Sequence, residues 1–315
     1  MKDYMAPMEG ITNYVYRNAY HQFFHPMDKY FTPFISAKPN KRLSSKEINE
    51  ISPEKNKGLY IVPQIMTKNA QDFIQTAEIL MEYGHRELNL NLGCPSGTVT
   101  AKGKGAGFLG EPDELNRFLD EIFEQLAVHS IKLSVKTRIG TDYVEEWTRL
   151  MEIYNQYPLE ELIIHPRLLI DYYKNTPHLE VYQQAVEAAK MPLVYNGDLF
   201  TVEAYQRIEE RFETTDTFMY GRGLIANPGL VTKIREQKNL DKKTLRAFHD
   251  AIYAEYKEIM SGERNVLFRM KELWAHMIGI FENNEKYAKK IKKAQKCSEY
   301  DAAISSLFAE QELNV

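Results

Sequence analysis

The chain has 315 residues, of which 40 are Lys or Arg and 44 are Asp or Glu, so its formal net charge is −4. This balance excludes a protein that holds polyanions through bulk positive charge alone. With 43% hydrophobic and 12% aromatic residues, the composition is that of a globular protein with a sizeable core, and it excludes disorder over most of the chain. The length accommodates an α/β barrel of about 250 residues plus a smaller domain.

Two cysteines, Cys94 and Cys297, are too few for a disulfide framework or a Cys-rich zinc site, and we expect no metal. The first twenty residues carry four charged side chains and no apolar run, and no eighteen apolar residues follow one another. We therefore expect a cytoplasmic protein that does not span a membrane.

In chain order, short β-rich runs alternate with segments of helical periodicity up to about residue 237. Strands are predicted near 2–7, 30–35, 60–65, 87–91, 132–137, 161–165, 192–196 and 217–221. Helices are predicted near 12–21, 69–83, 112–127, 143–156, 179–190, 201–211 and 227–236, and the pattern does not decide the type of a short element near 45–50. Eight such units favour a (β/α)₈ barrel, although a doubly wound open sheet would give a similar alternation.

Helix starts are expected at Thr12, Asn69, Pro112 and Thr201, which are capping or first-turn residues. After residue 238 the strand signals stop, and helices are predicted over 242–260, 264–282, 285–296 and 299–310. The polar stretch 236–239 is the expected boundary. It divides the chain into a barrel domain, 1–238, and an all-helical domain, 239–315.

The predicted helical domain carries 13 basic and 12 acidic residues, so its net charge is +1 and that of the remainder is −5. Six lysines occur among the eleven positions 286–296. A lysine run is usually a solvated helix face, but here it could also bind phosphates. Lys38, Lys41 and Arg42 form a possible second basic patch.

In a barrel the active site lies at the carboxyl ends of the strands, and polar residues follow nearly every predicted strand. Each of them alone could simply belong to a polar turn, but the set indicates a site. The residues are Glu9, Ser36, Gln64, Asn89, Asn91, Lys136, Arg138, His165, Arg167, Asn196, Asp198 and Arg222.

The segment 89–110 runs from an apolar strand through Gly93, Cys94 and Pro95 into a glycine-rich loop. Its glycines lack the spacing of a dinucleotide-binding turn and do not directly follow a strand, which argues against a Rossmann motif. A lone cysteine is more often a small buried hydrophobic residue than a catalyst. Its place at a strand end on such a loop favours a catalytic role for Cys94.

The final predicted strand leads through Gly221, Arg222 and Gly223 into a helix. Backbone N–H groups and a guanidinium would meet there, where barrel enzymes commonly hold a phosphate. The turn at Asn196 and Gly197 supplies the neighbouring strand end. Both turns could be structural, but as a pair they favour a cofactor phosphate site.

Taken together, several of these motifs resemble the tRNA-dihydrouridine synthases. The matches run in order from residue 5 to about 230, and the Asn-Leu-Gly-Cys-Pro motif of 91–95 is the most specific of them. After the sixth strand this chain has Pro166 and Leu168 around Arg167, where the family usually has Gly and Thr. The matching segments are 6–10, Gln64, 91–95, 105–106, 136–140, His165, 196–198 and 221–223.

The resemblance implies an FMN enzyme that reduces the C5–C6 double bond of specific uridines in tRNA, with NADPH as the electron source. Lys136 would lie by N1 and O2 of the flavin, where the reduced ring carries negative charge. Gln64 would face the O4 and N3 edge, and the turns at 196–198 and 221–222 would hold the ribityl chain and phosphate. The implied FMN-binding residues are Pro7, Met8, Glu9, Gln64, Lys136, His165, Asn196, Gly197, Asp198, Gly221 and Arg222.

The reaction adds a hydride from flavin N5 at C6 and a proton at C5, and Cys94 matches the family's proton donor. Lys102, Lys104 or Arg138 could stabilise the resulting thiolate. A uridine inside folded tRNA must be flipped out to reach a barrel rim, so the chain must also hold RNA. The residues expected to contact tRNA are Asn91, Lys102, Arg138, Lys286, Lys289, Lys290 and Lys293.

Three other functions stay open on the sequence. One is a flavin barrel that reduces a small enoate or pyrimidine, against which the basic tail argues. Another is an aldolase in which Lys136 forms a Schiff base. The third is an RNA-binding module without enzymatic activity.

Overall fold

The computed structural model describes residues 1–40 and 42–314, so Lys41 of the second basic patch lies outside the described residues. The strands are β1 (Lys2–Met5), β2 (Lys29–Phe31), β3 (Ile35–Ser36), β4 (Ile61–Val62), β5 (Gln64–Met66), β6 (Glu87–Leu92), β7 (Lys132–Arg138), β8 (Leu162–His165), β9 (Leu193–Tyr195) and β10 (Thr217–Tyr220). The helices up to residue 236 are α1 (Tyr14–Phe23), α2 (Ser45–Ile51), α3 (Ala70–Glu82), α4 (Gly97–Thr100), α5 (Pro112–His129), α6 (Glu146–Tyr154), α7 (Leu179–Ala188), α8 (Val202–Arg211), α9 (Arg222–Ala226) and α10 (Leu230–Glu236). Those that follow are α11 (Lys242–Ile259), α12 (Glu263–Met277), α13 (Glu285–Lys293) and α14 (Cys297–Glu310), and short 3₁₀ turns cover Pro53–Lys55, Gly105–Gly110 and Ile278–Ile280.

The strands form one parallel sheet that closes into a barrel. Their order is β3-β5-β6-β7-β8-β9-β10-β1-β2-β4, with β2 paired to β4 and β3 paired to β5. Pro63 separates β4 from β5 because it offers no N–H to the ladder. β4 and β5 are therefore two parts of one bent strand, β2 and β3 are two parts of the strand beside it, and the eight resulting strands complete the predicted (β/α)₈ barrel.

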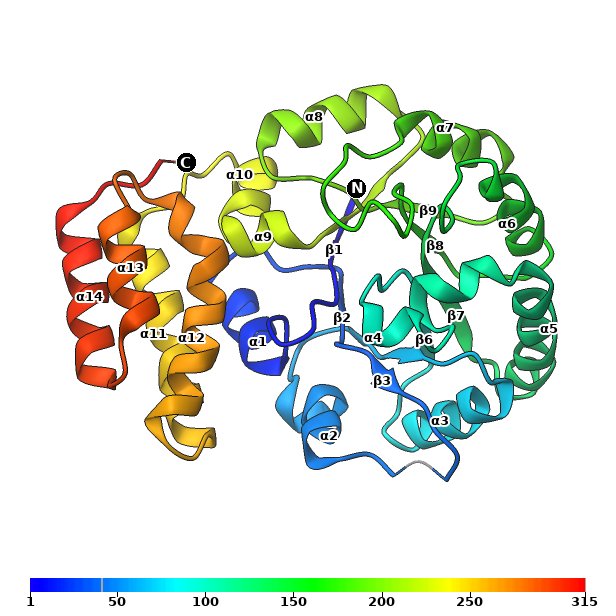
Figure 1. Ribbon diagram of the computed structural model, residues 1–315, viewed down its shortest axis with the longest axis horizontal. Helices are drawn as coiled ribbons and strands as arrows, with labels where there is room; N and C mark the ends of the chain where they lie inside the picture. Colours follow the sequence, from blue (N-terminus) through cyan, green and yellow to red (C-terminus); the bar gives the residue numbers. More distant parts are fainter. Residues whose placement is uncertain (41, 315) are drawn as a thin grey trace. The chain divides into compact units, whose positions relative to one another are not determined.

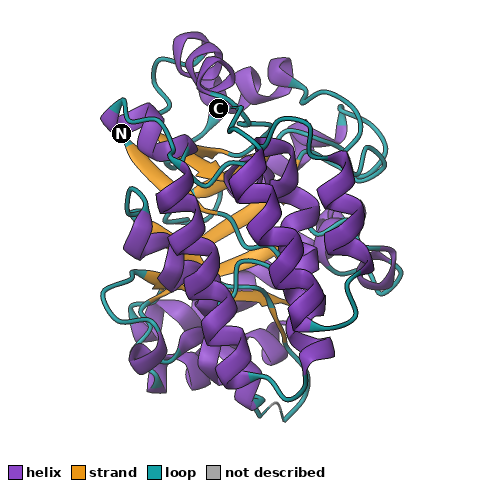
Figure 2. Ribbon diagram, turned by 90° about the vertical axis from the view of Figure 1, so that its left-hand side faces the viewer, coloured by secondary structure: helices purple, strands orange, loops and turns teal. Residues whose placement is uncertain are grey.

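Burial on both faces explains why these strands are rich in apolar residues. Every residue of β6, β8 and β10 is buried. Helices α3, α5, α6 and α7 lie outside the strands, and the strands lie side by side in Figure 2. The interior is filled by a cluster of buried side chains: Tyr4, Ala6, Phe31, Val62, Ile163, Val194 and Met219.

Several predicted helix boundaries need correction. The side chain of Asn13, not Thr12, caps α1 by accepting the N–H of Tyr16 at 3.1 Å, while the Thr12 hydroxyl accepts the N–H of Met8. The helix predicted over 227–236 begins at Leu230, and the short α9 precedes it. Asn69 caps α3 and Pro112 opens α5, as predicted.

The chain divides into two compact units. The first holds Met1–Pro7, Asp28–Gly197 and Arg207–Met219, and thus almost the whole barrel. The second holds Met8–Met27, Asp198–Gln206 and Tyr220–Val315, so the predicted boundary at 236–239 lies inside it. No helix among the described residues is both long enough and apolar enough to cross a lipid bilayer.

Within the second unit, α11–α14 form a bundle in which α1 packs on α11. His249, at the bundle core, bonds the Tyr300 hydroxyl at 2.7 Å, and the indole N–H of Trp274 donates to the same hydroxyl at 2.8 Å. Burial lowers the pKa of His249 even though Asp250 opposes that shift. The bundle core is thus built around a satisfied polar group.

A buried charge cluster closes the amino end of the barrel. The Lys29 ammonium lies 2.7 Å from Glu87 and 3.1 Å from Glu161, and all three side chains are largely buried. The hydroxyls of Tyr60 and Tyr4 donate to the same two carboxylates. Burial raises the pKa of Glu161, and the hydrogen bond and charge of its partners oppose that shift.

We expect Lys29→Met to lower the free energy of unfolding by about 3–5 kcal/mol, because it leaves two buried carboxylates without a cation. Urea unfolding followed by circular dichroism measures this loss. Lys132→Met, which breaks an exposed pair with Glu160, is the matched control and should change little. Equal losses in the two variants would show that the cluster does not stabilise the barrel.

Candidate active site

The strand register aligns the predicted site residues at the carboxyl end of the barrel. Gln64 lies opposite Asn89, Asn91 opposite Lys136, and Arg138 opposite His165. These residues belong to neighbouring strands of the first unit, β5 to β8. The sheet therefore gathers side chains that lie up to about a hundred positions apart in the sequence.

A chain of buried amides connects three of these strands. The Asn91 amide donates to Gln64 Oε1 at 2.7 Å, and the Gln64 amide donates to Asn89 Oδ1 at 2.7 Å. Asn89 in turn donates to the Ser134 hydroxyl at 2.9 Å. The sequence pointed to Gln64 and Asn91 as ligand contacts, and the structure shows that both also hold strand ends in register.

The loop that carries Cys94 is fixed from two sides. Asn91 Oδ1 accepts the N–H groups of Gly93 at 3.1 Å and Cys94 at 3.0 Å, and the Cys94 carbonyl accepts the N–H of Ala106 at 3.1 Å. Gly105 has φ +57°, and a Cβ there would lie 2.8 Å from the Cys94 carbonyl oxygen. The glycine-rich segment thus wraps closely around a half-buried Cys94.

Lys136 projects from β7 into this site, and its side chain is half-buried. Burial and, to a smaller extent, the Arg138 charge lower its pKa to about 7, although the nearby Cys94 opposes both. Among the described residues no carboxylate forms an ion pair with its ammonium. A half-buried amine in that state can donate or hold a proton near neutral pH, and it favours an electron-rich ligand.

Arg138 organises the loops around Lys136. Its buried guanidinium donates from Nε to the Gly93 carbonyl at 3.0 Å, from Nη1 to Leu168 at 2.7 Å and from Nη2 to Tyr172 at 2.6 Å. The guanidinium therefore bridges the Cys94 loop and the loop after β8. Its predicted contact with tRNA stays a prediction.

Arg167 has a similar scaffold role, which the sequence did not reveal. Its Nη1 lies 2.9 Å from Nε2 of His165, and its Nε donates to the Asn175 carbonyl at 2.8 Å. Because a guanidinium only donates, Nε2 of His165 is the acceptor and carries no proton. The loop departs from the family pattern here, yet Arg167 still holds its two ends together.

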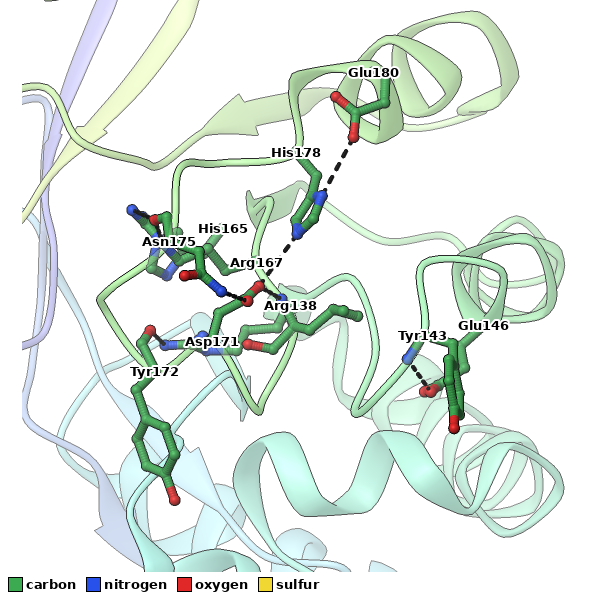
Figure 3. A network of polar contacts seen from close by, with 11 residues as sticks. Arg138, Tyr143, Glu146, His165, Arg167, Asp171, Tyr172, Asn175, His178 and Glu180 are labelled. Carbon is green, nitrogen blue, oxygen red and sulfur yellow. Dashed lines mark hydrogen bonds and ion pairs between the residues drawn. The ribbon is translucent and has the colours of Figure 1, made fainter.

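Asp171 completes this loop network (Figure 3). Its carboxylate accepts the side-chain amide of Asn175 at 2.5 Å and the N–H of Leu168 at 2.8 Å, and it lies 3.3 Å from His178. Partial burial would raise the pKa of Asp171, but these three hydrogen bonds outweigh it and lower the pKa. The spacing of Arg, Asp, Asn and His over 167–178 was the available sequence signal for this network.

On the neighbouring loop, Glu146 has a comparable function (Figure 3). Its carboxylate accepts the N–H groups of Thr141, Asp142 and Tyr143 at 2.7–2.9 Å. Partial burial acts to raise the pKa of Glu146, and these backbone hydrogen bonds lower it overall. The loop between β7 and α6 is therefore fixed from within.

The residues predicted to hold the cofactor phosphate are divided between the units. In the first unit the Asn196 amide donates to the Met219 carbonyl at 2.8 Å, and Gly197 is buried beside Tyr195. In the second unit Arg222 forms an ion pair with Asp198 at 2.6 Å.

The other residues of this predicted cofactor site lie at the ends of strands β1 and β10 and in the turn after β9. Gly221 directly precedes α9. Asp198 has φ +45°, and the Arg222 guanidinium lies over the Phe200 ring. Pro7 and Met8 follow β1 half-buried, and Glu9 is exposed.

The predicted RNA contacts are mostly exposed lysines. Lys102 is exposed on the Cys94 loop, and Lys286, at the start of α13, pairs with Glu310 at 3.1 Å. Between α13 and α14 lies a groove of about 420 Å³ in the second unit. Its polar lining consists of Lys289, Lys290, Lys293, Glu299 and Ser306.

The chain is similar in sequence to a known protein family and to individual proteins. Residues 4–313 match the sequence pattern of the dihydrouridine synthase (Dus) family. A tRNA-dihydrouridine(16) synthase of Pseudomonas putida is 26% identical over 254 residues, which cover 79% of this chain and 77% of the relative. One of Pseudomonas syringae pv. tomato is 28% identical over 237 residues, which cover 73% of each.

Solved structures share the fold at low identity. A variant of NCR from Zymomonas mobilis has a TM-score of 0.55 and 15% identity, and it covers 78% of this chain and 90% of its own. Morphinone reductase has a TM-score of 0.55 and 14% identity, with 78% and 88% covered. At this identity the likeness supports the barrel architecture alone.

The lowered pKa of Lys136 predicts a pH-dependent stability. The unfolded chain keeps this proton up to about pH 10.5, whereas the folded chain loses it near pH 7, so the free energy of unfolding should rise between these values. Lys136→Met has no group that titrates there, so its free energy of unfolding should not rise. The amount by which Lys136→Met is more stable than wild type should therefore shrink as the pH increases from about 7 to 10.5. Urea unfolding of ligand-free protein at several pH values measures it, and a constant difference would refute the low pKa.

Proposed function

Because the chain belongs to the dihydrouridine synthase family, we propose that it reduces the C5–C6 double bond of uridines in tRNA to 5,6-dihydrouridine. FMN is the proposed cofactor and NADPH the proposed electron donor. Bound reduced flavin would supply the hydride that adds at C6. The residues of the chain then have to bind the flavin, position the base and deliver a proton to C5.

The single observation that carries the cofactor proposal is the unpaired ammonium of Lys136. A half-buried ammonium whose pKa is lowered by desolvation and that has no acidic partner among the described residues is costly unless a ligand supplies electron density. The N1 and O2 edge of a flavin is such a ligand, because negative charge gathers there on reduction. The Gln64 carboxamide, two strands away on the same rim, is fully buried and bonded to Asn89 and Asn91, so a polar ring edge would have to share or displace one of these bonds.

Cys94 is the proposed proton donor. A thiol with an ordinary pKa of about 8.5 is mostly protonated near neutral pH, as a general acid must be. Asn91 and Gly105 fix the backbone of Cys94, and the Lys136 cation lies close enough to interact with its charge. Proton transfer from Sγ to C5 leaves a thiolate, which the Lys136 cation would stabilise.

Each unit also offers basic surface for RNA. In the first unit, burial and the charges of Lys102, Lys38 and Lys68 lower the pKa of Lys104, and Asp72 opposes them, so four lysines lie near one another. In the second unit, three lysines line the groove between α13 and α14. Both surfaces suit a phosphate backbone, with α11–α14 as the proposed tRNA-binding domain.

The decisive experiment for the function starts with the colour of the purified protein. We expect a yellow protein whose reduced flavin is reoxidised by tRNA and not by small enoates or pyrimidines. A colourless protein that does not take up FMN would contradict the proposal. It would then favour a Schiff-base reaction at Lys136, whose low pKa also suits that chemistry.

We expect Cys94→Ala to keep flavin content and tRNA affinity while uridine reduction falls by roughly 10²–10⁴-fold, the range for loss of a general acid. Single-turnover reoxidation of the reduced flavin by tRNA measures the step. Cys297→Ala, at the start of α14, is the matched control and should react like wild type. An unchanged rate in Cys94→Ala would remove the thiol from the mechanism.

Replacing Lys289, Lys290, Lys292 and Lys293 with Ala should weaken tRNA binding and flatten its salt dependence. Each lost phosphate contact lowers the slope of log K against log salt by roughly 0.7–0.9. Filter binding over a range of salt concentrations measures both quantities.

The control for this variant removes the same charge elsewhere. Lys55, Lys57, Lys132 and Lys190 are exposed lysines of the first unit. Their fourfold replacement with Ala should leave the slope near the wild-type value. If the two variants behave alike, the tail lysines have no specific part in RNA binding.

A further inference from the structure

The loop between β8 and α7 exposes large apolar side chains beside the proposed reaction centre. Ile170 is 55% exposed, Tyr172 49% and Tyr173 50%, although the same loop buries Arg167 and Asp171. Tyr173 is engaged on its inner side, where its ring stacks on His165 and lies 5.3 Å from the Arg138 guanidinium. Tyr172 makes no hydrogen bond through its hydroxyl among the described residues.

The backbone of Tyr172 is strained. Its φ is +49°, a left-handed conformation that glycine adopts readily and that a bulky aromatic residue rarely does. The other described non-glycine residues with positive φ are all polar: Asn40, Ser130, Asp198, Gln237 and Asn283. Glycine at position 172 would satisfy the turn without strain, so the fold alone does not account for the tyrosine ring.

One side chain connects the backbone of this strained residue to the loop that carries Cys94. Arg138 donates to the Tyr172 carbonyl at 2.6 Å through Nη2 and to the Gly93 carbonyl at 3.0 Å through Nε. A single guanidinium group therefore hydrogen-bonds to the backbone of both loops. Figure 3 shows the Tyr172 ring turned away from the polar network that holds its backbone.

We propose that the Tyr172 ring stacks on a nucleobase adjacent to the uridine that is reduced. The inference rests on the proposed function, since a uridine that reaches Cys94 brings its neighbouring nucleotides past the loop. A neutral aromatic ring suits a base rather than a phosphate, and stacking of this kind tolerates any base. Strain in the backbone is then the cost of presenting a ring at that point.

The test compares substitutions at position 172 on the flavin-loaded enzyme with an unmodified tRNA transcript. Tyr172→Phe should stay within about twofold of wild type. Tyr172→Ala and Tyr172→Leu should raise KM for tRNA about 5- to 150-fold, the equivalent of one lost stacking contact, with flavin content unchanged. Tyr172→Gly should raise KM equally and also raise Tm, because it relieves the left-handed strain.

Tyr60→Ala is the control, since this tyrosine is 52% exposed at the opposite end of the barrel, beside Glu87. Its KM should match wild type. A wild-type KM in Tyr172→Ala or Tyr172→Gly would overturn the proposal. A wild-type KM in Tyr172→Leu would also overturn it, because apolar packing would then replace stacking.

Failure of this inference is distinguishable from failure of the proposed function. If wild type forms no dihydrouridine in tRNA, the function itself is wrong. If wild type forms dihydrouridine, and Tyr172→Ala, Tyr172→Leu or Tyr172→Gly keeps the wild-type KM for tRNA, only the stacking contact is refuted. A fall of Tm in Tyr172→Gly would contradict the argument from strain.

Discussion

The site depends on one constraint, which is that a protonated amine inside a protein needs a nearby negative charge or must lose its proton. Lys136 projects from β7 into the barrel end, and no acidic residue among those described pairs with it. The barrel does pair another lysine, Lys29, with two carboxylates at the opposite end. The same fold thus pairs one lysine internally and leaves the other without an acidic partner among the described residues, at the end of the barrel where we propose that the reaction takes place.

Two buried arginines fix the loops at the carboxyl end of the barrel. Arg138 and Arg167 donate hydrogen bonds to backbone carbonyls of two loops, the Cys94 loop and the loop after β8, and to His165, so directional bonds hold both loops. Fixing loop backbones in this way lets the side chains that project from them face a ligand without losing position. It also explains how Pro166 and Leu168 are tolerated where the loop departs from the family pattern.

The sequence predicted the eight strands and their polar ends well, because strands buried on both faces are rich in apolar residues and are followed abruptly by polar ones. It predicted Asn91 and Cys94 through an unusual motif. It did not predict the short helix Gly97–Thr100 or the 3₁₀ turn Gly105–Gly110, since glycine-rich segments carry no periodic signal. Nor could it say that Arg138 spans two loops or that Arg222 pairs with Asp198, because those partners are set by long-range packing.

Polar residues at the rim are of two kinds. Asn89, Asn91 and Arg138 have their polar groups satisfied by the chain itself, so a ligand that contacts them must share or displace existing bonds. Lys136 has no such internal partner among the described residues, and the exposed ring of Tyr172 has no partner for its hydroxyl. Both are costly to the fold, one through desolvation and the other through backbone strain. Unfavourable features of this kind are retained in proteins where the group binds a ligand. Here Lys136 and Tyr172 both lie next to the loop that carries Cys94.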